Sequence, residues 1–194
     1  MQHKIATALI LASSITLAQV ATGASQDRDL FTHGPKDTNP NFVEPEAWKE
    51  TGSVQPPPLP NDADLVEFRI SDRTSPFRHY IDTKSLSVDA QQIVRYTVVV
   101  KSSSGGSNVA YEGIRCTPNG SFRTYAYGSG GRFQPASGAD WRDVNANGVP
   151  PYVRDLHRFY LCIPLKFEPR PVKEMPRVLS GRGSAKDNSG FLSE

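Results

Sequence analysis

Cysteine is scarce in this chain of 194 residues, which contains only Cys116 and Cys162. The two lie in separate segments, so the sequence has no C-x-x-C pair. A thioredoxin-like redox motif and a zinc knuckle both require such closely spaced cysteines. The scarcity therefore excludes both of these local sites.

Local catalytic signatures are missing as well. The sequence contains no G-x-S-x-G, H-E-x-x-H, Walker or dinucleotide-binding motif. A Ser/His/Asp triad needs no adjacency in sequence and stays open, but no segment points to one. The sequence indicates no enzyme class and no cofactor.

Neither sign of charge is in clear excess. The chain has 22 Lys and Arg against 20 Asp and Glu, a formal net charge of +2, and no long basic run. Nucleic-acid-binding domains carry a basic patch or stripe, and a high net charge creates a long-range field. The total charge predicts no nucleic-acid partner and no strong field toward an anionic membrane.

The N-terminus has the organisation of a secretory signal peptide. Lys4 supplies a positive charge, residues 5–17 are apolar, and Thr22, Gly23 and Ala24 are small. The apolar stretch is shorter than the ~20 residues of a membrane span. No cysteine lies near Ala24 for lipid attachment. We predict cleavage after Ala24 and a soluble, unlipidated chain in the periplasm.

Export to an oxidising compartment favours a disulfide between the two cysteines. Two thiols of one domain normally pair in an oxidising compartment, so we predict a Cys116–Cys162 disulfide. Three alternatives remain open. They are a nucleophilic cysteine with His79 or His157 as its base, a zinc site formed by these four side chains, and a redox-sensing thiol.

Composition divides the predicted mature chain into three parts. Residues 25–58 are rich in proline and charge and are predicted to be a flexible leader, with Trp48 and Leu59 packed on the domain. Residues 59–170 are predicted to form a single domain. Residues 171–194 are polar and rich in glycine, which predicts a disordered tail.

Within the domain the hydrophobic period changes from that of strands to that of a helix. Residues 64–70, 77–82, 93–101, 107–116 and 121–128 alternate or are rich in β-branched side chains, with short turns between them. Residues 152–162 carry a helical apolar stripe behind two prolines. The predicted fold is β-rich α+β, an antiparallel meander packed by a C-terminal helix. A small β-sandwich or a partly open barrel is the alternative.

Several segments together resemble the cryptic neisserial protein-like family. They are LPNDADLVEF, YIDTKSLSV, VRYTVVVKSSSGGSNVAYEGIRC, YAYG and the stretch from Trp141 to FYLC, in that order over residues 48–165. The resemblance implies a small exported protein of Gram-negative bacteria with no assigned activity, and its cysteine positions match Cys116 and Cys162. Many members are lipoproteins, whereas this chain has no cysteine to be lipidated.

Glu112 interrupts an apolar strand, and a buried charge is costly without a partner. We predict an ion pair with Arg95 or Arg123 on neighbouring strands, or else a carboxylate that binds a ligand. The opposite strand face is predicted to form a shallow groove or to cover a sheet edge. Its tyrosines and arginines are Tyr111, Tyr125, Tyr127, Arg115 and Arg123.

The segment DVNANGVPPYVRD begins like a calcium-binding loop. Asp143, Asn145, Asn147 and Gly148 match D-x-[DN]-x-[DN]-G. Arg154 stands at the twelfth position, where a bidentate acid belongs. The segment therefore predicts a turn before a helix more strongly than it predicts a metal site.

These observations favour a monomeric, non-enzymatic binding module of the cell envelope, with a small ligand or an envelope protein as its partner. A hydrolase that uses His79, His157 and Glu112 or Asp155 is one alternative. A structural protein stabilised by calcium at residues 143–155 is the other.

Overall fold

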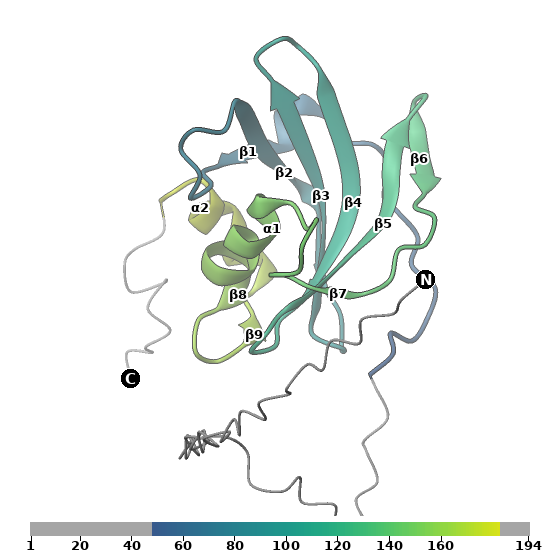
Figure 1. The fold of residues 1–194 in the computed structure, drawn as a ribbon, viewed down its shortest axis with the longest axis vertical. Coiled ribbons are helices and arrows are strands. Elements are labelled where there is room, and N and C mark those ends of the chain that lie inside the picture. The colour runs from purple at the N-terminus through teal and green to yellow at the C-terminus, as the bar shows by residue number, and fades with distance from the viewer. Residues whose placement is uncertain (1–47, 183–194) are drawn as a thin grey trace, which may run out of the picture. The chain divides into compact units, whose positions relative to one another are not determined.

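The computed structural model describes residues 48–182. The predicted signal peptide and most of the predicted leader lie outside this range. Within it the predicted antiparallel meander is confirmed. Six strands follow one another across the main sheet in the order β1-β2-β3-β4-β5-β6, and a short seventh strand, β7, pairs with β5 (Figure 1).

Strands β1 to β5 are those that the alternating pattern predicts, whereas β6 and β7 were not predicted. Strands β2, β3 and β5 extend past their predicted ends, and β1 and β4 are shorter than predicted. Their bounds are β1 (Leu65–Phe68), β2 (Phe77–Val88), β3 (Ile93–Ser102), β4 (Ser107–Arg115), β5 (Ser121–Ser129), β6 (Arg132–Pro135) and β7 (Arg142–Asp143). The sheet does not close into a barrel, because β1 and β6 form its two edges. The second sheet is only the hairpin of β8 (Cys162–Ile163) and β9 (Glu168–Pro169), so the sandwich alternative is wrong.

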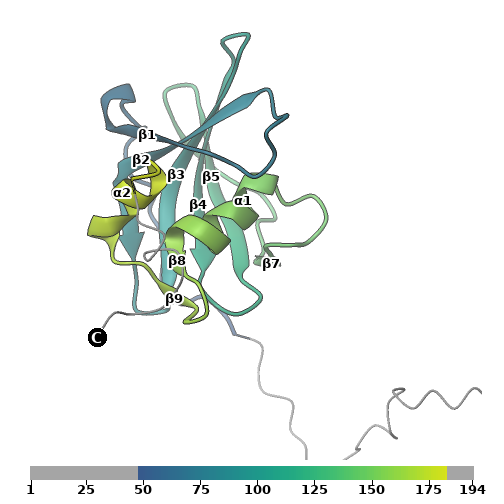
Figure 2. The same ribbon diagram turned by 90° about the vertical axis from the view of Figure 1, so that its left-hand side faces the viewer.

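One face of the sheet is covered by helices. Helix α1 (Pro151–Asp155) begins at a proline and continues into η2 (Leu156–Leu161), a π-helical segment, which confirms the predicted helix. Helix α2 (Met175–Leu179) lies on the same face (Figures 1 and 2). The 3-10 segments η1 (Asp62–Asp64) and η3 (Val172–Glu174) precede β1 and α2. No helix within residues 48–182 is long and apolar enough to cross a membrane.

The core lies between the sheet and these helices. Alternate residues of β3 face the helices, so Val94, Tyr96 and Val98 are buried there. Val153 and Leu156 close the core from the helical side, both with no exposed surface. The sheet and the helices thus enclose one hydrophobic core.

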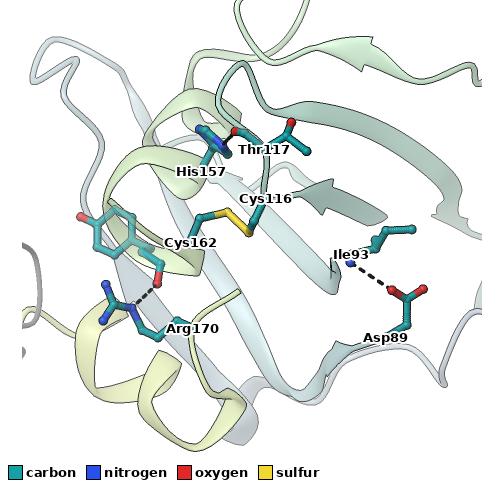
Figure 3. Close-up of a disulfide and its surroundings, with 8 residues drawn as sticks. Asp89, Ile93, Cys116, Thr117, His157, Cys162 and Arg170 are labelled. Atoms are coloured by element: carbon teal, nitrogen blue, oxygen red, sulfur yellow. Dashed lines mark hydrogen bonds between the residues drawn. A yellow bond between two sulfur atoms is a disulfide. The ribbon is translucent and has the colours of Figure 1, made fainter. Parts of the chain in front are cut away.

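The disulfide joins the two layers. Cys116 follows β4 and Cys162 follows η2, and their sulfur atoms are bonded (Figure 3). On either side of the bond, His157 contacts the carbonyl oxygen of Thr117, and Arg170 donates to the carbonyl oxygen of Tyr160. The predicted disulfide is confirmed, and both cysteines are consumed in it.

The predicted disordered tail does not begin at residue 171. Met175, Val178 and Leu179 of α2 are at most 3% exposed because they pack in the core. Their apolar spacing occupies little more than one helical turn, so the surrounding polar residues hide it in the sequence. The ordered domain therefore extends past residue 170, and the predicted tail beyond residue 182 lies outside the described residues.

Candidate functional site

The register of β3, β4 and β5 separates Glu112 from the arginines predicted to bind it. Arg95 and Arg123 both lie opposite Gly113, on the two sides of β4. Directly opposed residues share a face, and adjacent residues point to opposite faces. The predicted ion pair between Glu112 and Arg95 or Arg123 is therefore wrong.

Glu50 binds the two arginines instead. Its side chain is 4% exposed. Oε1 accepts hydrogen bonds from Arg95 Nη2 at 2.5 Å and from Tyr125 Oη at 2.8 Å. Oε2 accepts from Arg123 Nη1 at 2.9 Å and from Trp141 Nε1 at 3.1 Å. Burial alone would raise the pKa of Glu50, but the hydrogen bonds from Arg95 and Tyr125 outweigh it and hold that pKa below its ordinary value.

Gly113 makes this arrangement sterically possible. A Cβ atom on Gly113 would lie 2.9 Å from both Cε2 and Oη of Tyr125. Because that atom is missing, the Tyr125 ring lies over β4 and its hydroxyl group reaches Glu50. The ring centroid of Tyr111 lies 5.6 Å from that of Tyr125 and completes the aromatic cover.

The segment of residues 48–59, here called the strap, closes this face of the sheet. The Trp48 ring meets Trp141 edge-on at 5.4 Å, and the Arg115 guanidinium lies 4.0 Å from the Trp48 ring centroid. Leu59 lies so close to Gly128 that a Cβ atom there would be 3.1 Å from Leu59 Cδ2. Trp48 and Leu59 therefore pack on the domain as predicted. The strap therefore covers the part of the predicted ligand face around Tyr125 and Arg115. Tyr127 of that face is 55% exposed, and a cavity of about 480 Å³ lies between the strap and Arg123.

Sequence reasoning missed Glu50 as the partner of this face. Its only local signal is an acid two residues after Trp48, itself predicted to pack on the domain. Nothing in the sequence shows that Glu50, which lies 45 positions before Arg95 in the chain, binds that arginine of strand β3. Long-range docking of this kind needs the tertiary structure.

Glu112 lies in the core on the helix side. It is 2% exposed, and its Oε1 accepts a hydrogen bond from Tyr152 Oη at 2.8 Å. Its Oε2 has no hydrogen-bond partner within the described part of the chain. Burial raises the pKa of Glu112 to about 7, and the phenols of Tyr152 and Tyr96 oppose that rise only in part. Glu112 is therefore a core acid with no route to a ligand on the surface.

The two histidines lie in different surroundings. His79 is 6% exposed, and its ring lies 5.8 Å from Phe68 and 5.4 Å from Tyr152. His157 Nε2 lies 3.1 Å from the carbonyl oxygen of Thr117. Burial lowers the pKa of both histidines, so both are neutral near pH 7. The structure does not assemble them into the predicted hydrolase site.

The carboxylate groups of the other predicted sites already have local roles. Asp143 Oδ1 accepts hydrogen bonds from the backbone N–H of Asn145 at 2.7 Å and from its side-chain amide at 3.1 Å. Such an Asx turn explains the Asp-x-Asn pattern without a cation. Residues 48–182 contain no cluster of three or more His, Cys, Asp or Glu side chains suited to a metal ion. Asp155 accepts from the N–H and hydroxyl groups of Ser71 at 2.6 and 2.8 Å.

The open candidate site is a groove of about 530 Å³ between η2 and the connection of residues 69–76 that joins β1 to β2. Here it is called the β1–β2 groove. Asp155 holds this connection through Ser71, and Tyr160 Oη donates to the carbonyl oxygen of Arg69 at 2.6 Å. Phe77 and Phe159 line the groove and are 47% and 37% exposed. The helix therefore preorganises a concave site with aromatic walls.

Cationic side chains border the same groove. The side chains of Arg69 and Arg73 make no hydrogen bond or ion pair with any residue between 48 and 182, whereas Arg78 is paired with Glu67. His79 forms part of the lining, and the charge of Asp155 acts on its ring. Glu67 and Asp72 also line the groove, and the charge of Arg69 acts on Glu67. Guanidinium groups without a hydrogen-bond partner beside apolar walls suit a ligand with an apolar body and an anionic group.

The family model of the CNP1-like family matches residues 43–180. The chain belongs to the CNP1-like family. No curated protein and no solved structure matches the chain. The neisserial name in the resemblance drawn from the sequence stays a prediction.

The extent of the family match agrees with the packing. It begins before Trp48 and ends after Leu179, so it includes both the strap and α2. The domain predicted at 59–170 is shorter than this match at both ends. The strap contact through Glu50 therefore belongs to the family domain.

Proposed function

We propose that the protein is exported to the periplasm and acts there as a non-enzymatic binding module. Its ligand is a small molecule with an apolar or aromatic body and one anionic group, and it binds in the β1–β2 groove. The signal-like N-terminus and the disulfide support export. The guanidinium groups of Arg69 and Arg73, which have no hydrogen-bond partner within residues 48–182, lie beside Phe77 and Phe159 and carry the proposal for binding.

The size and composition of the groove support this ligand class. Its volume of about 530 Å³ lies within the range of small-molecule sites, which is about 300–1,000 Å³. The neutral ring of His79 at the groove supplies a hydrogen-bonding group without a charge. Binding affinity for the anion then comes from the arginines, while the aromatic rings hold the apolar body.

The test uses three related probes in two-dimensional amide NMR titrations. Phenylpropionate has both features, phenylpropionamide lacks the charge, and propionate lacks the ring. We expect saturable shifts at residues 69–79 and 159–160 with phenylpropionate, and at least about tenfold weaker binding of the other two. Equal binding of acid and amide, or shifts confined to other regions, would refute the proposal.

Arginine variants measure how much the positive charge contributes to binding of the acid. Arg69→Gln with Arg73→Gln removes both cations that have no hydrogen-bond partner within residues 48–182, and we expect the advantage of the acid over the amide to disappear. Arg132→Gln is the matched control, because Arg132 is an exposed arginine of β6, outside the groove. If Arg132→Gln weakens binding as much as the double variant does, a general charge effect replaces the proposed site.

A further inference from the structure

The loop of the β8–β9 hairpin presents two large apolar side chains to solvent. Leu165 is 68% exposed and Phe167 is 36% exposed. Both have a left-handed backbone, with φ of 66° for Leu165 and 56° for Phe167. Glycine, asparagine and aspartate tolerate that conformation far better than bulky residues do. The loop thus keeps two exposed apolar residues at positions where both solvation and backbone energy favour glycine.

The hairpin is held firmly at its base. The Cys116–Cys162 disulfide fixes its first strand, and the Arg170 N–H donates to the carbonyl oxygen of Leu161 at 2.8 Å. The Phe167 N–H donates to the carbonyl oxygen of Ile163 at 3.1 Å and closes the turn. The loop lies near the lower end of the domain in Figures 1 and 2. A rigid base and a strained apolar tip indicate a surface selected for contact rather than for folding.

Cations surround this tip. Arg154 and Arg158 line a cavity of about 270 Å³ together with Leu165 and Phe167, and no acidic residue lines it. Lys166 stands between the two apolar residues in the loop. Neither Arg154 nor Arg158 forms an ion pair or a side-chain hydrogen bond with residues 48–182, although Arg158 lies 5.3 Å from the Phe159 ring centroid. The nearby acids are Glu168, which follows Phe167 in the chain, and Asp143, whose charge acts on His157 of the cavity lining. Three cations against these two acids leave a local excess of positive charge.

We infer that the β8–β9 loop is a docking surface for an anionic phospholipid membrane. Leu165 and Phe167 enter the boundary between headgroups and acyl chains, and Arg154, Arg158 and Lys166 contact the lipid phosphates. Apolar insertion combined with basic side chains at headgroup level is the physical pattern of peripheral membrane binding. The total charge of +2 does not reveal this patch, because the fold brings Arg154 and Arg158 to the cavity that Leu165 and Phe167 line. The inference is independent of the β1–β2 groove.

The test is vesicle flotation with the exported protein, after mass spectrometry has located its N-terminus. We expect at least about tenfold stronger binding to vesicles containing phosphatidylglycerol than to phosphatidylcholine vesicles, and weaker binding at high salt. Equal binding to both vesicles would overturn the inference. Binding to poly-glutamate without binding to vesicles would also overturn it, in favour of an acidic protein partner.

Glycine variants separate contact from folding. Leu165→Gly with Phe167→Gly removes both apolar side chains and relieves both left-handed positions. We expect binding to fall at least about tenfold, with an unchanged or higher melting temperature. Val88→Ser is the matched control, because Val88 is 38% exposed on β2. Wild-type binding by the glycine variant, or an equal loss in the control, would contradict the assignment.

Discussion

The buried carboxyl group of Glu112 makes the stability of the protein depend on pH in a definite direction. Its pKa is about 7 in the folded chain against an ordinary value of 4.5, because burial penalises the carboxylate form. Unfolding exposes the group to water and returns the pKa to its ordinary value. The folded state therefore loses stability relative to the unfolded state as the pH rises from about 4.5 through 7.

The size of the effect follows from the same two values. Each pKa unit of difference between the folded and unfolded states corresponds to about 1.4 kcal/mol, so Glu112 costs the folded state about 3 kcal/mol at pH 8 relative to pH 4. Other groups act in the opposite direction. Burial lowers the pKa of His79 and His157 below the ordinary value of 6.5. The folded state therefore loses stability relative to the unfolded state as the pH falls below 6.5. The wild-type profile alone therefore does not isolate Glu112.

The substitution Glu112→Gln isolates it. Glutamine keeps the shape of the side chain and an oxygen that accepts from Tyr152, but it does not ionise. Its unpaired amide adds a cost that does not change with pH, so the decisive quantity is the pH dependence of the difference between variant and wild type. Urea unfolding with the disulfide intact is measured at several values from pH 5 to pH 8. We expect the variant to gain about 2–3 kcal/mol relative to wild type over this range.

A flat difference from pH 5 to pH 8 would refute this reasoning. The control is Glu67→Gln, at an exposed acid whose pKa is lowered by Arg78, and its difference stays flat above pH 5. NMR titration of the Glu112 side-chain carboxyl carbon gives an independent reading. A midpoint near the ordinary value would contradict the buried placement of Glu112.

Three further predictions concern the strap and the disulfide. Replacing Cys116 and Cys162 together by serine is expected to lower the free energy of unfolding by about 4 kcal/mol in the chain-entropy model. Urea unfolding measures this loss, and a loss below about 1 kcal/mol would contradict the prediction. Glu50→Gln removes the carboxylate of Arg123 and leaves Arg95 with Asp89 alone, and it costs about 2–4 kcal/mol by thermal unfolding. Glu67→Gln at an exposed pair costs less than about 1 kcal/mol, and equal losses would show that the strap contact is unimportant. Gly113→Ala places a Cβ atom against the overlying ring of Tyr125 and lowers the free energy of unfolding by about 1–3 kcal/mol in thermal unfolding. An unchanged melting temperature would show that the ring moves freely.

The sequence by itself determined the five main strands, the helix that begins at Pro151 and the covalent link. Period-2 alternation and short turns predicted the meander, and Pro150 and Pro151 marked the start of the helix. These features are local, since they depend on neighbours in the chain and on backbone preferences. The disulfide was predictable for a different reason, because only one pair of cysteines is available.

Only the tertiary structure decided which side chains meet. One position of strand register moved Glu112 to the core and Arg95 to the opposite face, where Glu50 from a distant segment binds it. The buried tail helix with Met175 and the preorganised β1–β2 groove also depend on contacts between distant segments. Pairings of this kind carry no periodic signal, because their free energy comes from burial and complementary charge rather than from local conformation.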